Sequence, residues 1–173
     1  MPSAARSRGL DVALAAPNEA AADAGDQIAR AGGNAIDAAL AASLVTMVNE
    51  VGIVSPSSGG FITVQPPDGS APQTVDGWMD MPGRGATARG DAGTWDVHTE
   101  YGGGVTVTIG PGSVAAHGAI AAFEEAHRRW GKIPWRELVE PAIDVARRGF
   151  RLSSASRYYL EYSHADIFGW DDT

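Results

Sequence analysis

The side chains that could act as metal ligands or as general acids and bases are few in this sequence and widely spaced. The histidines are His98, His117, His127 and His164, and no two of them stand at the spacing of a metal-binding motif. The sequence contains no cysteine, which excludes disulfides, thiolate zinc sites and a cysteine nucleophile. We therefore predict neither a metal site nor a cofactor site. His127 follows a helical pattern beside Arg128, and we expect it at the surface.

The acidic residues do not suggest a catalytic centre either. Glu19, Asp23 and Asp26 share one face of a predicted helix, but they lack the partners that a metal site or an acid–base pair would need. Asp76 is expected to support a loop by hydrogen bonding, which is a structural role. The acidic residues are therefore not interpreted as a catalytic or metal site.

The charge balance narrows the classes of partner. A net charge of −8 over 173 residues disfavours nucleic acid and anionic membrane surfaces. The one concentrated basic stretch, Arg128, Arg129 and Lys132, is interpreted as the solvated end of a helix. Asp11 interrupts the apolar residues near the N-terminus, and no apolar run is long enough to cross a bilayer. We expect a cytoplasmic protein that binds neither nucleic acid nor a membrane.

The first half of the chain has strong helix signals. Asn18 is placed to cap a helix that ends at Ala31, before two glycines. Asn34 begins a second helix, with Asp37 in a capping-box-like position, and this helix runs to Val48. Its many alanines permit close packing, so we expect it to be a buried core helix.

Strands and further helices follow. Residues 61–65 and 73–76 form a predicted β-hairpin around the turn at Asp68-Gly69, and 105–109 reads as a short strand. Residues 81–104 are rich in glycine and small polar groups and are expected to be irregular. Helices are expected at about 114–130 and 134–148, and another could begin near 153. A two-stranded hairpin is too small to be a stable sheet by itself, so the chain looks like part of a larger fold.

Five blocks of sequence carry a resemblance to a known family. They are RAGGNAIDAA at 30–39, SGGF at 58–61, VDG at 75–77, GPGSVA at 110–115 and WGKIPW at 130–135, the last continuing to GF at 149–150. In this order they closely resemble the large subunit of the gamma-glutamyltransferases, also called gamma-glutamyltranspeptidases or glutathione hydrolases. Each block alone is weak, but the ordered set is specific, and it covers roughly 12–160.

The resemblance implies an α+β fold, the αββα sandwich of the N-terminal-nucleophile hydrolases, to which this chain would supply helices and a β-hairpin. It implies a precursor that cuts itself, after which the new N-terminal threonine of the small subunit acts as nucleophile. Residues 1–173 would be the N-terminal segment of the large subunit of one such domain, incomplete on its own. Its partners would be the remainder of the large subunit, the small subunit bearing the threonine, and a small-molecule substrate. The nucleophile would lie outside this chain, so the resemblance implies no catalytic residue within it.

One departure from the family pattern bears on the substrate. The family has Asp-x-Arg-Glu followed shortly by proline, and its arginine binds the α-carboxylate of the gamma-glutamyl group. Here the residues are Asp76, Gly77, Trp78 and Met79, followed by Pro82. An indole has one donor and no charge, so Trp78 cannot replace the guanidinium. We interpret this as a changed substrate contacted by Trp78 and Met79.

Two alternatives concern the same region. Trp78 could be a core residue, with the carboxylate bound by Arg84 or Arg89 instead. Ser57 and Ser58 stand where the family has part of a four-glycine run, and they could line the site. Serines in turns more often bond to the local backbone, and we favour that role for them.

Three functions follow as hypotheses. The first is a hydrolase with altered specificity, such as a biosynthetic enzyme that cleaves a C–C bond in antibiotic pathways building 4-alkylproline units. The second is an ordinary gamma-glutamyl transferase or glutathione hydrolase whose arginine has moved. The third is a non-catalytic homologue or scaffold subunit.

Overall fold

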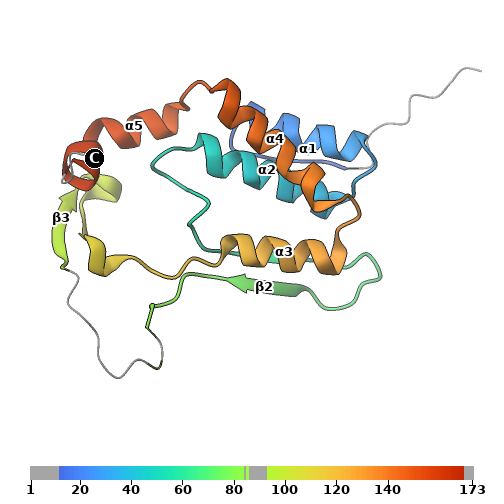
Figure 1. Cartoon of the computed structure of the whole chain (residues 1–173), viewed down its shortest axis with the longest axis horizontal. Coiled ribbons are helices and arrows are strands. Elements are labelled where there is room, and N and C mark those ends of the chain that lie inside the picture. The colour runs from blue at the N-terminus through green and yellow to red at the C-terminus, as the bar shows by residue number, and fades with distance from the viewer. Residues whose placement is uncertain (1–11, 84, 86–92, 170–173) are drawn as a thin grey trace, which may run out of the picture. The chain divides into compact units, whose positions relative to one another are not determined.

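The computed structural model describes residues 12–83, 85 and 93–169 (Figure 1). Arg84 and Arg89 lie outside the described residues. The chain divides into two compact units. The first contains the described residues up to Asn49 together with Phe123–Arg151, and the second contains Glu50–Ala122 and the described residues from Leu152 on. No helix among the described residues is both long and apolar enough to cross a membrane.

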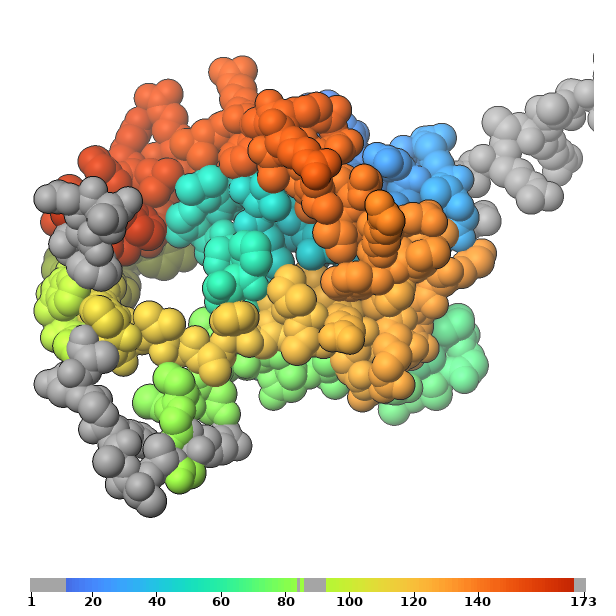
Figure 2. Space-filling view, viewed as in Figure 1, coloured from blue at the N-terminus to red at the C-terminus, as the bar shows by residue number. Residues whose placement is uncertain are grey.

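The first unit is built on packed helices. The helices α1 (Glu19–Arg30), α2 (Ala35–Asn49) and α4 (Trp135–Arg148) contact one another, and the C-terminal part of α3 (Ala119–Trp130) belongs to the same unit. Figure 2 shows α4, in orange, covering part of α2, in cyan. The helix α2 is the buried core helix that the sequence predicts. Its buried apolar side chains are small or branched. These are Ala38, Leu40, Ala41, Ala42, Leu44 and Val45.

The ends of α1 are set by local hydrogen bonds, as the sequence predicts. The Asn18 side chain accepts the backbone N–H of Ala21 at 3.0 Å, which caps the first turn. The helix stops because Gly32 has a φ of +99°, a conformation that side-chain-bearing residues rarely adopt. The helix therefore needs no tertiary contact to define its limits.

A buried carboxylate joins α2 to the loop after α3. Asp37 is fully buried, and its oxygens accept the backbone N–H of Asn34 at 2.9 Å and that of Lys132 at 3.0 and 3.1 Å. The Asn34 side-chain amide donates to the carbonyl of Trp130 at 2.7 Å. The first of these bonds is the capping box that the sequence predicts, whereas the bonds to Lys132 connect residues 95 positions apart.

The prediction for His127 was wrong. Its side chain is half-buried, with Nε2 lying 2.6 Å from the carbonyl oxygen of Ile133 and the ring tilted against Trp135. The chain turns back at Gly131 directly after α3, and this turn brings Ile133 and Trp135 onto the histidine. The basic end of α3 is solvated as expected.

Two antiparallel hairpins form the strands of the second unit, where the sequence analysis expected one. The strand β1 (Gly60–Val64) pairs with β2 (Gln73–Gly77), which confirms the first hairpin. The strand β3 (Trp95–Thr99) pairs with β4 (Val105–Ile109). The assignment of all of 81–104 to irregular structure was therefore wrong. The polar residues of β3 are held by its partner, for example by the hydrogen bond from the Thr108 hydroxyl to Asp96 at 2.6 Å.

The start of α3 also differs from the prediction. The helix begins at Ala119 and not near Val114, because Ala116 forms an antiparallel bridge with Asp80 and Pro111–Ser113 forms a short 3₁₀ turn. The chain from Gly110 to Gly118 is thus a connector that approaches the end of β2. After α4 ends at Gly149, whose φ is +76°, the helix α5 (Ser154–Ser163) confirms the expected C-terminal helix.

A second buried carboxylate anchors the start of α5. Glu50 is 5% exposed, and its Oε2 accepts the hydroxyls of Ser153 at 2.6 Å and Ser156 at 3.0 Å. Ser153 is also the N-cap of α5, since its Oγ accepts the N–H of Ser156. A negative charge at this position is stabilised by the positive end of the helix dipole. The loop that follows α2 is thereby tied to a helix more than 100 residues later in the chain.

We predict that Glu50→Ala lowers the free energy of unfolding by about 2–3 kcal/mol, because it removes the buried carboxylate that accepts the hydroxyls of Ser153 and the fully buried Ser156. The control is Glu161→Ala on α5, which breaks an ion pair with Arg157 whose two side chains are 73% and 59% exposed. That exposed pair is worth less than about 1 kcal/mol. Urea unfolding of the full-length protein measures both values. Equal losses for the two variants would contradict the anchoring role of Glu50.

Candidate functional site

The candidate site forms where β2 ends and three segments of the second unit meet. The backbones of Asp80 and Ala116 exchange two hydrogen bonds, at 3.0 and 2.8 Å. The N–H of Ala119 donates to the carbonyl of Ser58 at 3.1 Å. The loop before β1, the segment after β2 and the connector before α3 are thus held together by main-chain hydrogen bonds.

Glycines allow these backbones to come so close. A Cβ on Gly59 would lie 2.6 Å from the backbone nitrogen of Met79, and one on Gly118 would lie 2.6 Å from the carbonyl oxygen of Gly77. Real Cβ atoms essentially never approach other atoms this closely, so any other residue would force the segments apart. The geometry of the site therefore depends on small residues at positions distant in the sequence.

Trp78 is an exposed aromatic platform at the centre of this arrangement. Its ring stacks on Phe61 at 5.5 Å between centroids, with an interplanar angle of 7°. The two side chains are 55% and 60% exposed, so Trp78 does not belong to the core of this chain. Phe61 pairs with Asp76 across the hairpin, and Trp78 follows Asp76 by two residues, which places both rings on one face.

The backbone at Trp78 is held independently of its ring. The N–H of Trp78 donates to Asp76 Oδ1 at 2.9 Å, which agrees with the supporting role predicted for Asp76. Asp80 Oδ1 accepts the N–H of Met81 at 2.8 Å. Neither 55–61 nor 76–83 contains a lysine or arginine, so these segments offer an anionic ligand no cation.

Residues 21–171 match the model of the family described as gamma-glutamyltranspeptidase. This chain belongs to the gamma-glutamyltranspeptidase family.

Individual relatives agree with the family assignment. The chain is 30% identical over 158 residues to a glutathione hydrolase proenzyme of Pseudomonas aeruginosa, covering 86% of this chain and 26% of the relative. It is 35% identical over 136 residues to the acylase ACY 1 proenzyme of Pseudomonas sp. strain SE83, covering 75% and 23%. The chain thus spans about a quarter of the length of the curated relatives it matches.

The fold prediction is confirmed as well. The structure superimposes on the gamma-glutamyltranspeptidase of Pseudomonas nitroreducens, solved in complex with L-DON, with a TM-score of 0.71 and 28% identity. The match covers 91% of this chain and 45% of that chain. The helices and antiparallel hairpins are therefore part of the α+β fold of the N-terminal-nucleophile hydrolases.

The structure brings together most of the residues proposed for substrate binding in this family member. Met79 is 40% exposed, next to Trp78, and packs against Gly59 of the loop that also contains Ser57 and Ser58. The Ser58 hydroxyl accepts the N–H of Ser55 at 2.9 Å, which is the local backbone role that the sequence favours. Ser57 is exposed, and its N–H donates to the Ser55 hydroxyl. Arg84, the fifth proposed residue, lies outside the described residues.

Two parts of the site were not predicted from the sequence. Phe61, the stacking partner of Trp78, looked like an ordinary strand residue, although the hairpin register would have placed it opposite Asp76. The connector containing Ala116 and Gly118 carries no local signal for its contact with the end of β2. Among the described residues, no group of three or more His, Asp or Glu side chains is arranged to hold a metal ion.

Proposed function

We propose that this chain is the N-terminal segment of the large subunit of a self-processing N-terminal-threonine hydrolase, and that its substrate lacks the gamma-glutamyl head. The segment contributes a wall of the substrate site, while the nucleophile and the remaining parts of the fold come from the rest of the large subunit and from the small subunit. The name "proenzyme" of the relatives supports a precursor that is cut.

The observation that carries the altered specificity is the Trp78–Phe61 stack. It presents two exposed ring faces at the position where the family resemblance implies a carboxylate-binding arginine. A ring face attracts apolar and aromatic groups, whereas a carboxylate placed there would lose water without gaining a cation. The platform is therefore suited to an uncharged, apolar substrate portion.

The 35% sequence identity to the acylase ACY 1 proenzyme supports a reaction in which an amide bond is cleaved and the substrate is not a gamma-glutamyl compound. Cleavage of a C–C bond in the biosynthesis of 4-alkylproline units is the narrower version of the same proposal. An ordinary glutathione hydrolase is the alternative, supported by the glutathione hydrolases among the relatives. A non-catalytic subunit is the third possibility, and it predicts no turnover of any substrate.

The substrate class is tested with two anilides, one carrying a gamma-glutamyl group and one carrying a phenylacetyl group. We expect the processed full-length protein to hydrolyse the phenylacetyl anilide with the higher kcat/KM. A higher value for the gamma-glutamyl anilide would establish the ordinary glutathione hydrolase instead. The two anilides share the leaving group, so the ratio reports only on recognition of the acyl part.

We predict that the full-length protein is inactive until it is cut into two subunits, because the nucleophile of the proposed mechanism is an N-terminal threonine whose own amino group acts as base. Replacing that threonine by alanine in the complete coding sequence is expected to leave one uncut polypeptide without activity. Gel electrophoresis and the anilide assay measure the two effects together. A protein that remains uncut and yet turns over substrate would contradict the proposal.

A further inference from the structure

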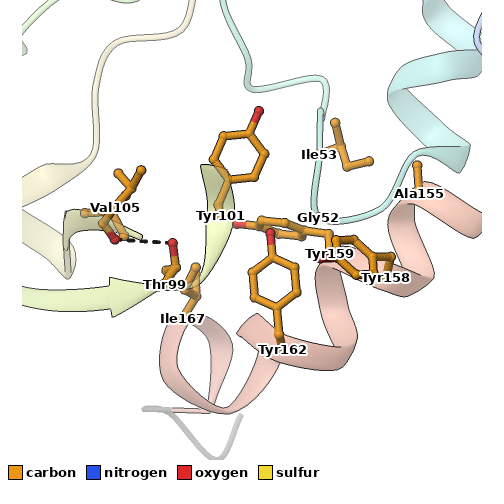
Figure 3. A pocket seen from close by; sticks show the side chains of 11 residues that line it. Gly52, Ile53, Thr99, Tyr101, Val105, Ala155, Tyr158, Tyr159, Tyr162 and Ile167 are labelled. Carbon is orange, nitrogen blue, oxygen red and sulfur yellow. Dashed lines mark hydrogen bonds between the residues drawn. The ribbon is translucent and has the colours of Figure 1, made fainter. Parts of the chain in front are cut away.

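The second unit contains a hollow that is lined by none of the residues assigned to the substrate site. The cavity has a volume of about 510 Å³ and is bordered by α5, the β3–β4 hairpin and the loop after Glu50 (Figure 3). We call it the tyrosine pocket, after Tyr101, Tyr158, Tyr159 and Tyr162 in its lining. A volume of this size is in the range of small-molecule sites.

The walls of the tyrosine pocket are aromatic and carry no charge. Glycine, alanine and branched apolar residues complete the lining, and Thr99 supplies the only polar side chain besides the tyrosines. The Thr99 hydroxyl donates to the carbonyl of Val105 at 3.3 Å, as the dashed line in Figure 3 indicates. The tyrosine hydroxyls are thus the polar groups that the lining can offer to a ligand.

The tyrosine rings are held by one another. Tyr162 contacts Tyr158 edge-to-face at 5.3 Å and Tyr159 at 5.5 Å, so the three rings of α5 support a defined shape. Burial raises the pKa of Tyr162, and the neighbouring tyrosines add to this effect. Tyr101 and Tyr158 are 65% and 70% exposed, which leaves the pocket open to solvent on one side.

The backbone around the pocket is also specialised. Gly52 has a φ of +83°, and a Cβ there would lie 3.1 Å from side-chain atoms of Tyr159 and Leu160, so the loop after Glu50 packs directly on α5. Beyond α5 the chain makes a π-helical turn, His164–Phe168, which brings Ile167 into the lining. Such turns occur frequently at functional sites.

We propose that the tyrosine pocket binds a small, uncharged aromatic molecule whose ring packs against Tyr159 and Tyr162. An apolar ring gains contact area on the tyrosine faces, and one polar atom of the ligand hydrogen-bonds a tyrosine hydroxyl. An anionic ligand is disfavoured because the lining contains no lysine or arginine to compensate the loss of its water. The proposal does not depend on the reaction that the protein catalyses.

The test uses indole as the probe and the full-length protein, with binding followed by ligand-detected NMR. We expect saturable binding of indole, and binding of indole-3-acetate that is at least about tenfold weaker because of its carboxylate. Tyr162→Ala is expected to weaken indole binding by about tenfold, because it removes a ring–ring contact and the apolar surface area buried in that contact. Ala155→Trp fills the pocket without removing a ring and is expected to abolish binding.

The control variant is Val114→Ala, which alters an exposed side chain outside the pocket and should leave indole binding unchanged. Thermal unfolding of each variant checks that the fold is retained. If Tyr162→Ala does not fold, Ala155→Trp still tests the pocket, because it keeps all four tyrosines. The proposal is overturned if the full-length protein binds no indole, as when other parts of the polypeptide fill the pocket. It is equally overturned if both pocket variants bind indole as the wild type does.

Discussion

Trp78→Arg is expected to raise kcat/KM for a gamma-glutamyl anilide by about a hundredfold to several thousandfold, the effect of restoring a charged partner worth about 3–5 kcal/mol to a carboxylate. The change is compatible with the local structure. The Trp78 side chain is exposed, and the backbone at this position is held by the hydrogen bond to Asp76, which the substitution leaves in place. A guanidinium can stack on Phe61 much as the indole does.

Two matched variants distinguish the effect of the charge at position 78 from the effect of the volume that the indole occupies. Trp78→Ala removes the ring without adding charge, and we expect it to leave gamma-glutamyl activity low. Trp78→Lys adds the charge without the planar fork, so it should recover only part of the gain. The phenylacetyl anilide should lose activity in all three variants, since each removes the indole face.

The pattern across the three variants decides the interpretation. If Trp78→Ala raises gamma-glutamyl activity as much as Trp78→Arg does, the indole acts by blocking space and the missing charge is not the cause. If none of the variants raises it, Trp78 does not determine the specificity of the site.

Asp37→Ala is expected to lower the free energy of unfolding by about 2–5 kcal/mol, because it removes the buried carboxylate that accepts the backbone N–H groups of Asn34 and Lys132. Both groups lie in segments that fix the geometry of the first unit, one at the start of α2 and the other after α3. The carboxylate also lies in the first turn of α2, where the helix dipole favours a negative charge.

The measurement combines urea unfolding with hydrogen exchange of the full-length protein. The amides of Asn34 and Lys132 should exchange much faster in the variant, which a general loss of packing would not single out. Asp37→Asn keeps one acceptor oxygen and should cost less. Asp26→Ala, which breaks only the exposed pair with Arg30, should cost less than about 1 kcal/mol. Unchanged exchange at Asn34 and Lys132 in Asp37→Ala would refute the assignment.

The sequence by itself determined the helix limits that depend on neighbouring residues. Asn18 caps α1, Gly32 ends it, and Gly149 ends α4, each through a hydrogen bond or a backbone conformation within one turn of the helix. The family could also be inferred from the sequence, because its ordered blocks are themselves sequence patterns. These features need no knowledge of which distant segments meet.

Only the tertiary structure decided the features that join distant parts of the chain. The strand β3 is held by the hydrogen bonds that β4 supplies, because its five residues, although Trp95 and Val97 alternate with Asp96 and His98, are too few to form a stable strand alone. No local sequence signal indicates that Glu50 accepts the hydroxyl of Ser153, 103 positions later. The Trp78–Phe61 stack likewise depends on the hairpin register, which sets the face on which each ring lies. Local hydrogen bonds fix the ends of elements, whereas burial and stacking depend on which elements the fold brings together.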